Sequence, residues 1–104
     1  MRIEVVARPG IEVTEAIRAH ATEKGSKLPK YYDGTQMATY TLTKSDRPHF
    51  FTAELVVDVE KAPAFVSHAE SEDLYQAIDQ VTQKCVRQLT DFKEKLKVDK
   101  HHAR

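Results

Sequence analysis

One long amphipathic segment, residues 71–96, constrains the fold more than any other part of the chain. Its apolar side chains recur at steps of three and four residues, which places them on one stripe of an α-helix of about six turns. These apolar positions are Leu74, Ile78, Val81, Cys85, Leu89, Phe92 and Leu96. Ser71 is the expected N-cap, and Glu72 and Asp73 suit the positive end of the helix. A helix with one apolar stripe must bury it, so the rest of the chain has to supply a matching surface.

Four other segments alternate between apolar and polar residues, as half-buried β-strands do. The predicted strands cover residues 1–7, 35–43, 50–59 and 64–70. The third is the clearest, and one of its faces carries Phe51, Ala53, Leu55, Val57 and Val59. The opposite face of the middle strands is polar and carries Thr39, Thr41, Thr52, Glu54 and Asp58. The pattern therefore predicts a sheet with one face on a core and one face in water.

A second, shorter helix is expected between the first two strands. Thr14 is the predicted N-cap. The apolar stripe of this helix consists of Ile17, Ala21 and Leu28. Gly25 lies on the same stripe and weakens the helix by about 1 kcal/mol relative to alanine. Pro29 lacks a backbone N–H and disfavours helical geometry in the residue before it, so we expect the helix to end or distort at about Leu28.

The resulting order of elements, β-α-β-β-β-α, predicts an α+β fold. The economical packing is a four-stranded sheet with both helices on one face and the other face open to water. The chain has 104 residues, of which 40% are hydrophobic, and this suits one core and one domain. We assign residues 1–96 to that domain. Residues 97–104 are polar and are expected to form a frayed C-terminal tail.

The composition disfavours exported and membrane proteins. No apolar stretch approaches the roughly 20 residues that cross a bilayer, and the N-terminus lacks the apolar region of a signal peptide. The single cysteine, Cys85, has no internal disulfide partner and falls on the long helix stripe, where a buried thiol is expected. We therefore expect a cytoplasmic protein with no membrane partner.

The sequence contains no constellation that indicates catalysis. Only three glycines are present, and no glycine-rich phosphate loop is found. The five histidines include one adjacent pair, His101 and His102, and a solvated polar tail explains this pair more simply than metal binding does. We expect no enzymatic activity, no metal, no cofactor and no small-molecule substrate.

The placement of the basic residues is the feature that is informative about function. Sixteen basic and sixteen acidic residues give a net charge of zero, so an RNA site has to come from sorting the charges onto one face. On the long helix, Lys84 and Lys95 fall on one flank of the apolar stripe, with Arg87 further round. The last turns before the chain leaves the short helix carry Lys24, Lys27 and Lys30. The charge pattern alone fits an ordinary solvated helix surface at least as well, because lysines complement helix C-termini.

Two stretches carry a resemblance to a known family. The first is VTEAIR at residues 13–18, followed by KxxKLxKYYD at residues 24–33. The second and stronger stretch is HAESEDLYQAID at residues 68–79, continued by KxxRQLxxFKEKL at residues 84–96. Together they resemble the ribosome hibernation-promoting and ribosome-associated inhibitor family, also called the sigma-54 modulation protein family, in its short form. The resemblance covers essentially the whole chain.

The resemblance implies the same β-α-β-β-β-α fold and binding in the decoding region of the small ribosomal subunit. Occupancy there overlaps mRNA and tRNA, so translation stops. The rRNA-binding residues that it implies are Lys84, Arg87, Lys95, Lys24, Lys27, Lys30 and Arg8. Such residues bind RNA phosphates electrostatically, which gives a strong salt dependence. The family usually carries a large apolar residue at the position of Gly25 and a continuous helix across that of Pro29.

Several alternatives stay open at this point. Tyr31 and Tyr32 either stack on bases or pack at the edge of the core. The chain is either a translation-silencing ribosome binder or a non-enzymatic protein-interaction module on the same scaffold, which uses the acidic open sheet face or a strand edge. A small unrecognised enzyme is a third reading, without a constellation to support it. We expect a monomer when the protein is free, because one core uses both apolar stripes.

Overall fold

The computed structural model describes the backbone of residues 1–102 and the side-chain surroundings of residues 1–97. The strands are β1 (Arg2–Ala7), β2 (Thr35–Lys44), β3 (Phe51–Val59) and β4 (Phe65–Ser71). The helices are α1 (Glu15–Gly25), a short 3-10 helix η1 (Leu28–Lys30) and α2 (Leu74–His102). This order confirms the predicted β-α-β-β-β-α arrangement, with strand ends displaced from the predicted ones by at most one residue.

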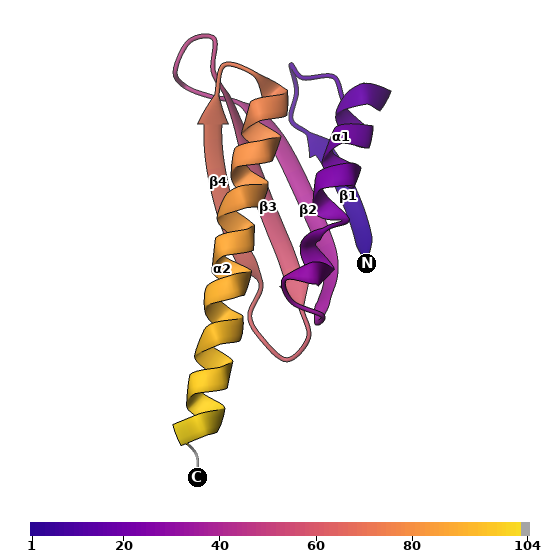
Figure 1. Cartoon of the computed structure of the whole chain (residues 1–104). Helices are drawn as coiled ribbons and strands as arrows, with labels where there is room; N and C mark the ends of the chain where they lie inside the picture. Colours follow the sequence, from indigo (N-terminus) through magenta and orange to yellow (C-terminus); the bar gives the residue numbers. More distant parts are fainter. Residues whose placement is uncertain (103–104) are drawn as a thin grey trace.

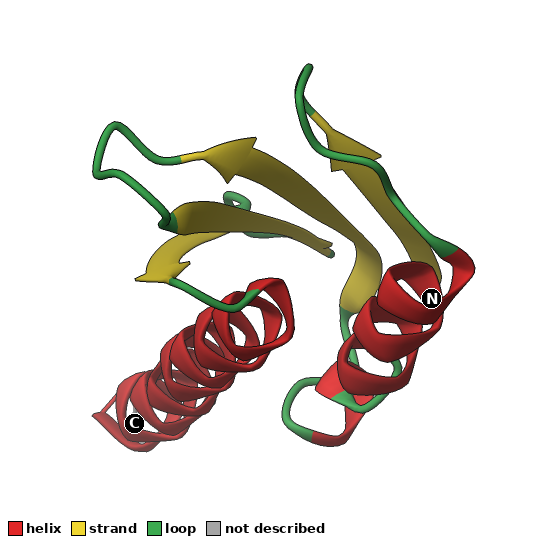
Figure 2. Cartoon of the chain, turned by 90° about the horizontal axis from the view of Figure 1, so that it is seen from above, coloured by secondary structure: helices red, strands yellow, loops and turns green. Residues whose placement is uncertain are grey.

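The four strands form one mixed sheet in the order β1-β2-β3-β4. β1 pairs with β2 in parallel, and the other neighbours are antiparallel. A parallel pair needs a crossover connection, and α1 lies within it. Both helices cover the same face, with α1 over β1 and β2 and α2 over β3 and β4, and the second face is left open (Figures 1 and 2). The predicted α+β architecture is therefore confirmed.

The core lies between the sheet and the helices. The strands contribute inward side chains such as Tyr40, Leu42 and Leu55, and α2 contributes Ile78 and Leu89 from its apolar stripe, all fully buried. The polar residues predicted for the other face alternate with these and stay outside the core: Thr39, Thr41, Thr52, Glu54 and Asp58. The predicted assignment of the two sheet faces is thus confirmed.

One buried hydrogen bond joins the sheet to α2. The hydroxyls of Tyr40 and Thr82 lie 2.7 Å apart. Thr82 donates its own proton to the carbonyl of Ile78, at 2.7 Å, so Tyr40 has to be the donor of the shared bond. This bond ties α2, which lies over β3 and β4, to a side chain of β2.

The end of α1 differs from the prediction. The α-helix stops at Gly25, three residues before Leu28, and a turn leads into η1. Gly25 is buried against the sheet, and a Cβ there would lie 3.1 Å from Ile3 Cδ1 and 3.3 Å from the ring and hydroxyl of Tyr40. Pro29 cannot donate the backbone hydrogen bond that would continue the helix, and η1 begins instead. Leu28 is nevertheless fully buried, as its place on the stripe predicts.

The beginning of α2 also corrects the sequence prediction. Ser71 is the last residue of β4 rather than the helix cap. Asp73 takes the capping role, because its carboxylate accepts from the backbone N–H of Tyr75 at 2.8 Å. Ser71 supports the turn, since its hydroxyl accepts from the N–H of Asp73 at 3.2 Å.

The C-terminal part of α2 extends past the sheet (Figure 1). Its last large contact with the core is Phe92, which packs edge-on against Tyr32 and Phe65 at ring separations of 5.5 and 5.2 Å. Leu96 is already 43% exposed. The backbone stays helical through His102, beyond the predicted domain boundary at residue 96. Fraying of residues 97–104 stays a prediction, and the side chains of residues 98–104 lie outside the described part of the chain.

Candidate nucleic-acid interface

Two adjoining hollows mark the helical side of the molecule. The first, of about 370 Å³, lies between the end of α1 and α2, and its lining consists of Lys24, Lys27, Tyr31, Asp79, Thr82, Gln83 and Val86. The second, also about 370 Å³, follows α2 outward, and its lining consists of Asp79, Gln80, Gln83, Lys84 and Arg87. Asp79 and Gln83 belong to both. The structure thus gathers four of the seven predicted basic residues around one stretch of α2.

A carboxylate at the centre of this surface connects the two helices. Asp79 Oδ1 lies 2.6 Å from His20 Nε2 and 3.8 Å from Lys24 Nζ, both on α1. The His20 ring also packs edge-on against Tyr75 of α2, at 5.1 Å between ring centroids. Asp79 therefore positions Lys24 and holds α1 against α2, while it adds one negative charge to a largely basic surface.

Lys84 lies on the flank of α2 that faces the edge of β4. Its ammonium donates to the carbonyl of His68 at 2.6 Å. One turn further on, Gln88 Nε2 donates to the carbonyl of Val66 at 3.0 Å. These two side chains occupy carbonyls of an edge strand, which otherwise attract a further strand. Lys84 thus has a structural contact in the free protein besides its predicted role.

Lys27 and Arg87 differ from Lys24 and Lys84 in their contacts. Both are exposed, and neither forms an ion pair within 4.0 Å in the part of the chain with described side chains. Their charges are therefore available to an anionic partner without breaking a contact. An exposed tyrosine, Tyr31, lines the same hollow as Lys27.

The three remaining predicted residues lie elsewhere. Lys30 ends η1 and Lys95 follows the last core contact of α2, and neither lines the two hollows. Arg8 emerges on the open face of the sheet, on the far side from the helices, and lines a different hollow there. The alternation of β1 explains this, because Val5 and Ala7 point toward the core and the next residue in register turns outward.

Tyr31 and Tyr32 also lie in different surroundings. Tyr32 packs against Phe92 at the edge of the core, which favours the packing reading of that residue. Tyr31 stays 39% exposed in the hollow between the helices.

Sequence reasoning missed Asp79, Gln83 and His20 as members of this surface. The helical spacing of Asp79, Gln83 and Arg87 by four residues is the signal that groups the α2 members.

The remaining chemistry of the described residues is sparse. No group of three or more His, Cys, Asp or Glu side chains within the described residues is arranged to hold a metal ion. Cys85 is fully buried, as predicted, and burial raises the pKa of its thiol to about 11. A thiol protonated at neutral pH is a poor nucleophile. None of the helices among residues 1–102 is long and apolar enough to cross a bilayer.

Comparison with known proteins relates this chain to a family. The sequence profile of the family described as "Sigma 54 modulation protein / S30EA ribosomal protein" matches residues 3–97. The ribosome hibernation promoting factor of Escherichia coli (strain K12) is 38% identical over 87 residues, which cover 84% of this chain and 88% of that protein. The factor of the same name from Azotobacter vinelandii is 34% identical over 85 residues, covering 82% and 77%.

Two solved structures share the fold. The crystal structure of the Thermus thermophilus Protein Y N-terminal domain superposes with a TM-score of 0.77 at 31% identity, covering 88% of this chain and 99% of that one. A ribosomal subunit interface protein from Coxiella burnetii superposes with a TM-score of 0.80 over 90% of this chain, at 19% identity, which is a likeness of fold alone. The profile match and the relatives above 30% identity confirm the resemblance, and the chain belongs to the sigma 54 modulation protein / S30EA ribosomal protein family.

Proposed function

We propose that this protein binds the small ribosomal subunit and silences translation as a hibernation factor. The binding surface is the helical face, and the central contacts are made by Lys24, Lys27, Lys84 and Arg87. The site of binding is the decoding region, where the protein excludes mRNA and tRNA. Two relatives bear the name ribosome hibernation promoting factor, and this supports the proposal.

The observation that carries the proposal is the grouping of basic side chains from both helices around Gln83 and Asp79. The chain as a whole is uncharged, so a basic surface exists only because the fold sorts its charges. Lys27 and Arg87 supply charges without acidic partners among the residues with described side chains, and Lys24 is held in place by Asp79. Such a surface suits a structured RNA, which proteins recognise mainly by shape and phosphate positions.

The mechanism is electrostatic. Lysine and arginine side chains neutralise rRNA phosphates and release counterions, so the affinity falls steeply as salt rises. Lys84 has to leave the His68 carbonyl, or share its protons with it, when it meets a phosphate. Tyr31, exposed beside Lys27, is placed to stack on an unpaired base.

We further propose that the protein acts in the cytoplasm as a monomer and without catalysis, metal, cofactor or small-molecule substrate. The competing reading is a protein-interaction module with weak or no ribosome binding. The zero net charge and the engagement of Lys84 with the sheet favour that reading.

Co-sedimentation with purified small subunits tests the proposal. We expect the protein to pellet with the subunits at about 50 mM salt and to be largely released at about 200 mM. Subunits preloaded with mRNA and initiator tRNA should take up much less protein. Addition of the protein to a cell-free translation reaction should lower the yield.

A lysate from resting cells, separated on a sucrose gradient, provides the physiological control. The protein should migrate with ribosomal particles. Its absence from every ribosomal fraction, together with failure to pellet with purified subunits at low salt, would favour the protein-interaction module instead.

A further inference from the structure

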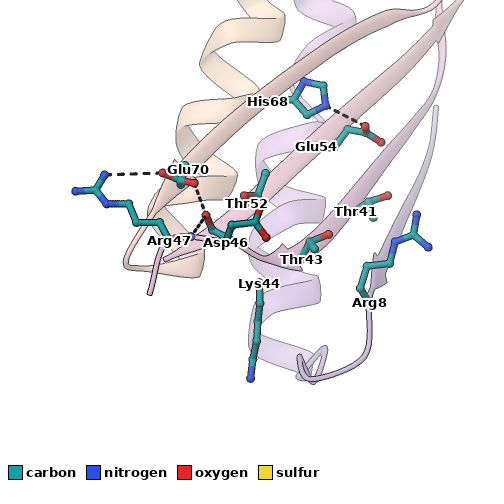
Figure 3. Close-up of a pocket in the computed structure, with 11 residues that line it drawn as sticks. Arg8, Thr41, Thr43, Lys44, Asp46, Arg47, Thr52, Glu54, His68 and Glu70 are labelled. Carbon is teal, nitrogen blue, oxygen red and sulfur yellow. Dashed lines mark hydrogen bonds and ion pairs between the residues drawn. The ribbon is translucent and has the colours of Figure 1, made fainter. Parts of the chain in front are cut away.

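The open face of the sheet carries a hollow of about 570 Å³ at the end where β1 and β4 finish (Figure 3). Its floor is made of hydroxyl-bearing side chains on β2 and β3, namely Thr41, Thr43 and Thr52. Arg8 borders it on the β1 side, and the loop after β2 borders it at the top end of the sheet. The helices lie on the other side of the strands.

The charged side chains around this hollow differ in their contacts from one side to the other. On the β3 and β4 side two carboxylates, those of Glu54 and Glu70, already have partners. Glu54 contacts His68 at 3.0 Å, and Glu70 contacts Arg47 at 3.9 Å and also accepts from the Ser45 hydroxyl. Glu54 and Glu70 are thus engaged within the protein, whereas Asp46, which also lines the hollow, forms no ion pair within 4.0 Å among residues 1–97.

The β1 and β2 side is different. Arg8 and Lys44 line the hollow, and neither forms an ion pair within 4.0 Å among residues 1–97. The Lys44 stem passes close to Gly10, where a Cβ would lie 3.2 Å from Lys44 Cε. Gly10 has a φ of +96°, which suits glycine, so the loop after Arg8 closes onto the end of β2. Arg8 and Lys44 are thereby held at the same end of the sheet.

We infer that this hollow is a second binding site for an RNA backbone, separate from the helical face. Guanidinium, ammonium and threonine hydroxyl donors are the groups that bind phosphate oxygens. A backbone that follows the β1 side meets Arg8 and the threonines first and Lys44 next, and it avoids Asp46 and Glu70 on the far side. Because this inference rests on the proposed function, the RNA is a second segment of the same ribosomal subunit.

The shape of the molecule makes the two sites distinct. The helices and the open face lie on opposite sides of the sheet (Figure 2). The chain measures 53 × 25 × 18 Å overall. A single short stretch of RNA therefore cannot contact both the helical face and the open face. A protein with phosphate-binding groups on both faces is suited to a gap between two RNA segments, which it bridges.

Tethered hydroxyl-radical cleavage tests the inference directly. Cys85 is fully buried, so a single introduced cysteine carries an iron–EDTA label selectively. One variant is Asp46→Cys at the rim of the open-face hollow, and the other is Gln83→Cys on the helical face. We expect both to cleave rRNA of bound small subunits, at two different segments.

The outcomes separate the inference from the proposed function. Cleavage from Gln83→Cys alone, or contact of Asp46→Cys with ribosomal proteins only, would overturn the open-face RNA site and leave the helical face as the RNA surface. Cleavage of a single shared segment by both variants would also contradict it. If neither variant cleaves rRNA or pellets with subunits, the proposed function fails, and this inference fails with it.

Charge reversal gives a second measurement. Arg8→Glu with Lys44→Glu should weaken binding to small subunits at least about tenfold and lower the slope of log affinity against log salt by about one to two. The control is Arg2→Glu with Lys61→Glu, which changes net charge equally at the opposite end of the sheet. Equal losses in both pairs would mean a general charge effect and would overturn the site. If the glutamate pair does not fold, Arg8→Gln with Lys44→Gln should still weaken binding relative to Arg2→Gln with Lys61→Gln.

Discussion

The two helices reach the same face of the sheet by different means. α2 has 29 residues, and its apolar stripe runs without interruption along β3 and β4. α1 has 11 residues, and only Ile17, Ala21 and Gly25 are buried. Its position depends on individual contacts instead, above all the close approach of Gly25 to Tyr40 and the contact of His20 with Asp79.

This difference matters for the proposed RNA surface. Hydrophobic stripes tolerate replacement of one apolar residue by another of similar volume, whereas single contacts do not. Lys84 and Arg87 lie on α2, whereas Lys24 lies in the last turn of α1 and Lys27 comes just after it. We therefore expect mutations around α1 to disturb stability and the RNA surface together.

The largest effect should come from Gly25→Phe, which places in this chain a large apolar residue of the kind usual in the family. The added ring meets Ile3 and Tyr40 at a site where even a Cβ is tight. We expect a loss of about 3 kcal/mol or more in the free energy of unfolding, measured by urea denaturation. Tyr40→Val combined with Gly25→Phe should recover part of this loss, because it vacates the space that the ring needs.

Glu23→Phe, an exposed position on the same helix, is the matched control and should change stability by less than about 0.5 kcal/mol. Full stability in Gly25→Phe, or no recovery in the double variant, would show that α1 does not depend on the contact between Gly25 and Tyr40.

A second expected effect is a loss of stability at alkaline pH, over different pH ranges for the regions beneath α1 and α2. Burial raises the pKa of Tyr40, beneath the end of α1, from 10.0 to about 12, although the Thr82 hydrogen bond opposes this. Burial raises the pKa of Cys85, beneath α2, from 9.0 to about 11. Both folded-state pKa values exceed the unfolded ones, so the stabilisation is complete below pH 9 and is lost as pH rises through 9–11 for Cys85 and 10–12 for Tyr40.

Urea denaturation at pH 7.5 and 10.5 should therefore show a loss of roughly 3 kcal/mol in the wild-type protein. Cys85→Val should remove most of that loss, and Tyr40→Phe a smaller share. A loss in Cys85→Val as large as in the wild type would contradict the burial of this thiol.

A smaller effect is expected at the contact between the helices. Asp79→Ala removes the partner of His20 and Lys24, and we expect a loss of about 1 kcal/mol. Asp79→Asn keeps a hydrogen-bond acceptor and should lose less. Asp91→Ala removes an exposed carboxylate of the same helix and serves as the control. Hydrogen exchange should show faster opening of α1, with α2 unchanged; equal effects in Asp79→Ala and Asp91→Ala would exclude the proposed link.

The same difference between the helices separates the features that the sequence predicts from those that it does not. The α2 stripe and the strand alternation predicted the architecture, because each pattern reports a face that has to be buried. The end of α1 was predicted three residues too late. Its last residue, Gly25, lies against Tyr40, which is 15 residues further along the chain. No local pattern reveals such a contact.

The candidate surface was predicted in part. Helical spacing placed Lys84 and Arg87 correctly on α2, and the basic residues near the end of α1 came close to them. Arg8 was grouped with the helices through the resemblance alone, although the alternation of residues 3, 5 and 7 assigns it to the opposite sheet face. Asp79 was missed, since a carboxylate is not sought in an RNA-binding surface.

Equilibrium binding to purified small subunits tests the central claim most directly, through two variants with the same change in net charge. Lys27→Glu with Arg87→Glu alters the hollows that join the helices, while Lys30→Glu with Lys95→Glu alters predicted residues outside them. We predict that the first pair weakens binding by about 100-fold at low salt and that the second weakens it only a few-fold. Equal losses in the two pairs, or unchanged binding in the first, would contradict the assignment of this surface.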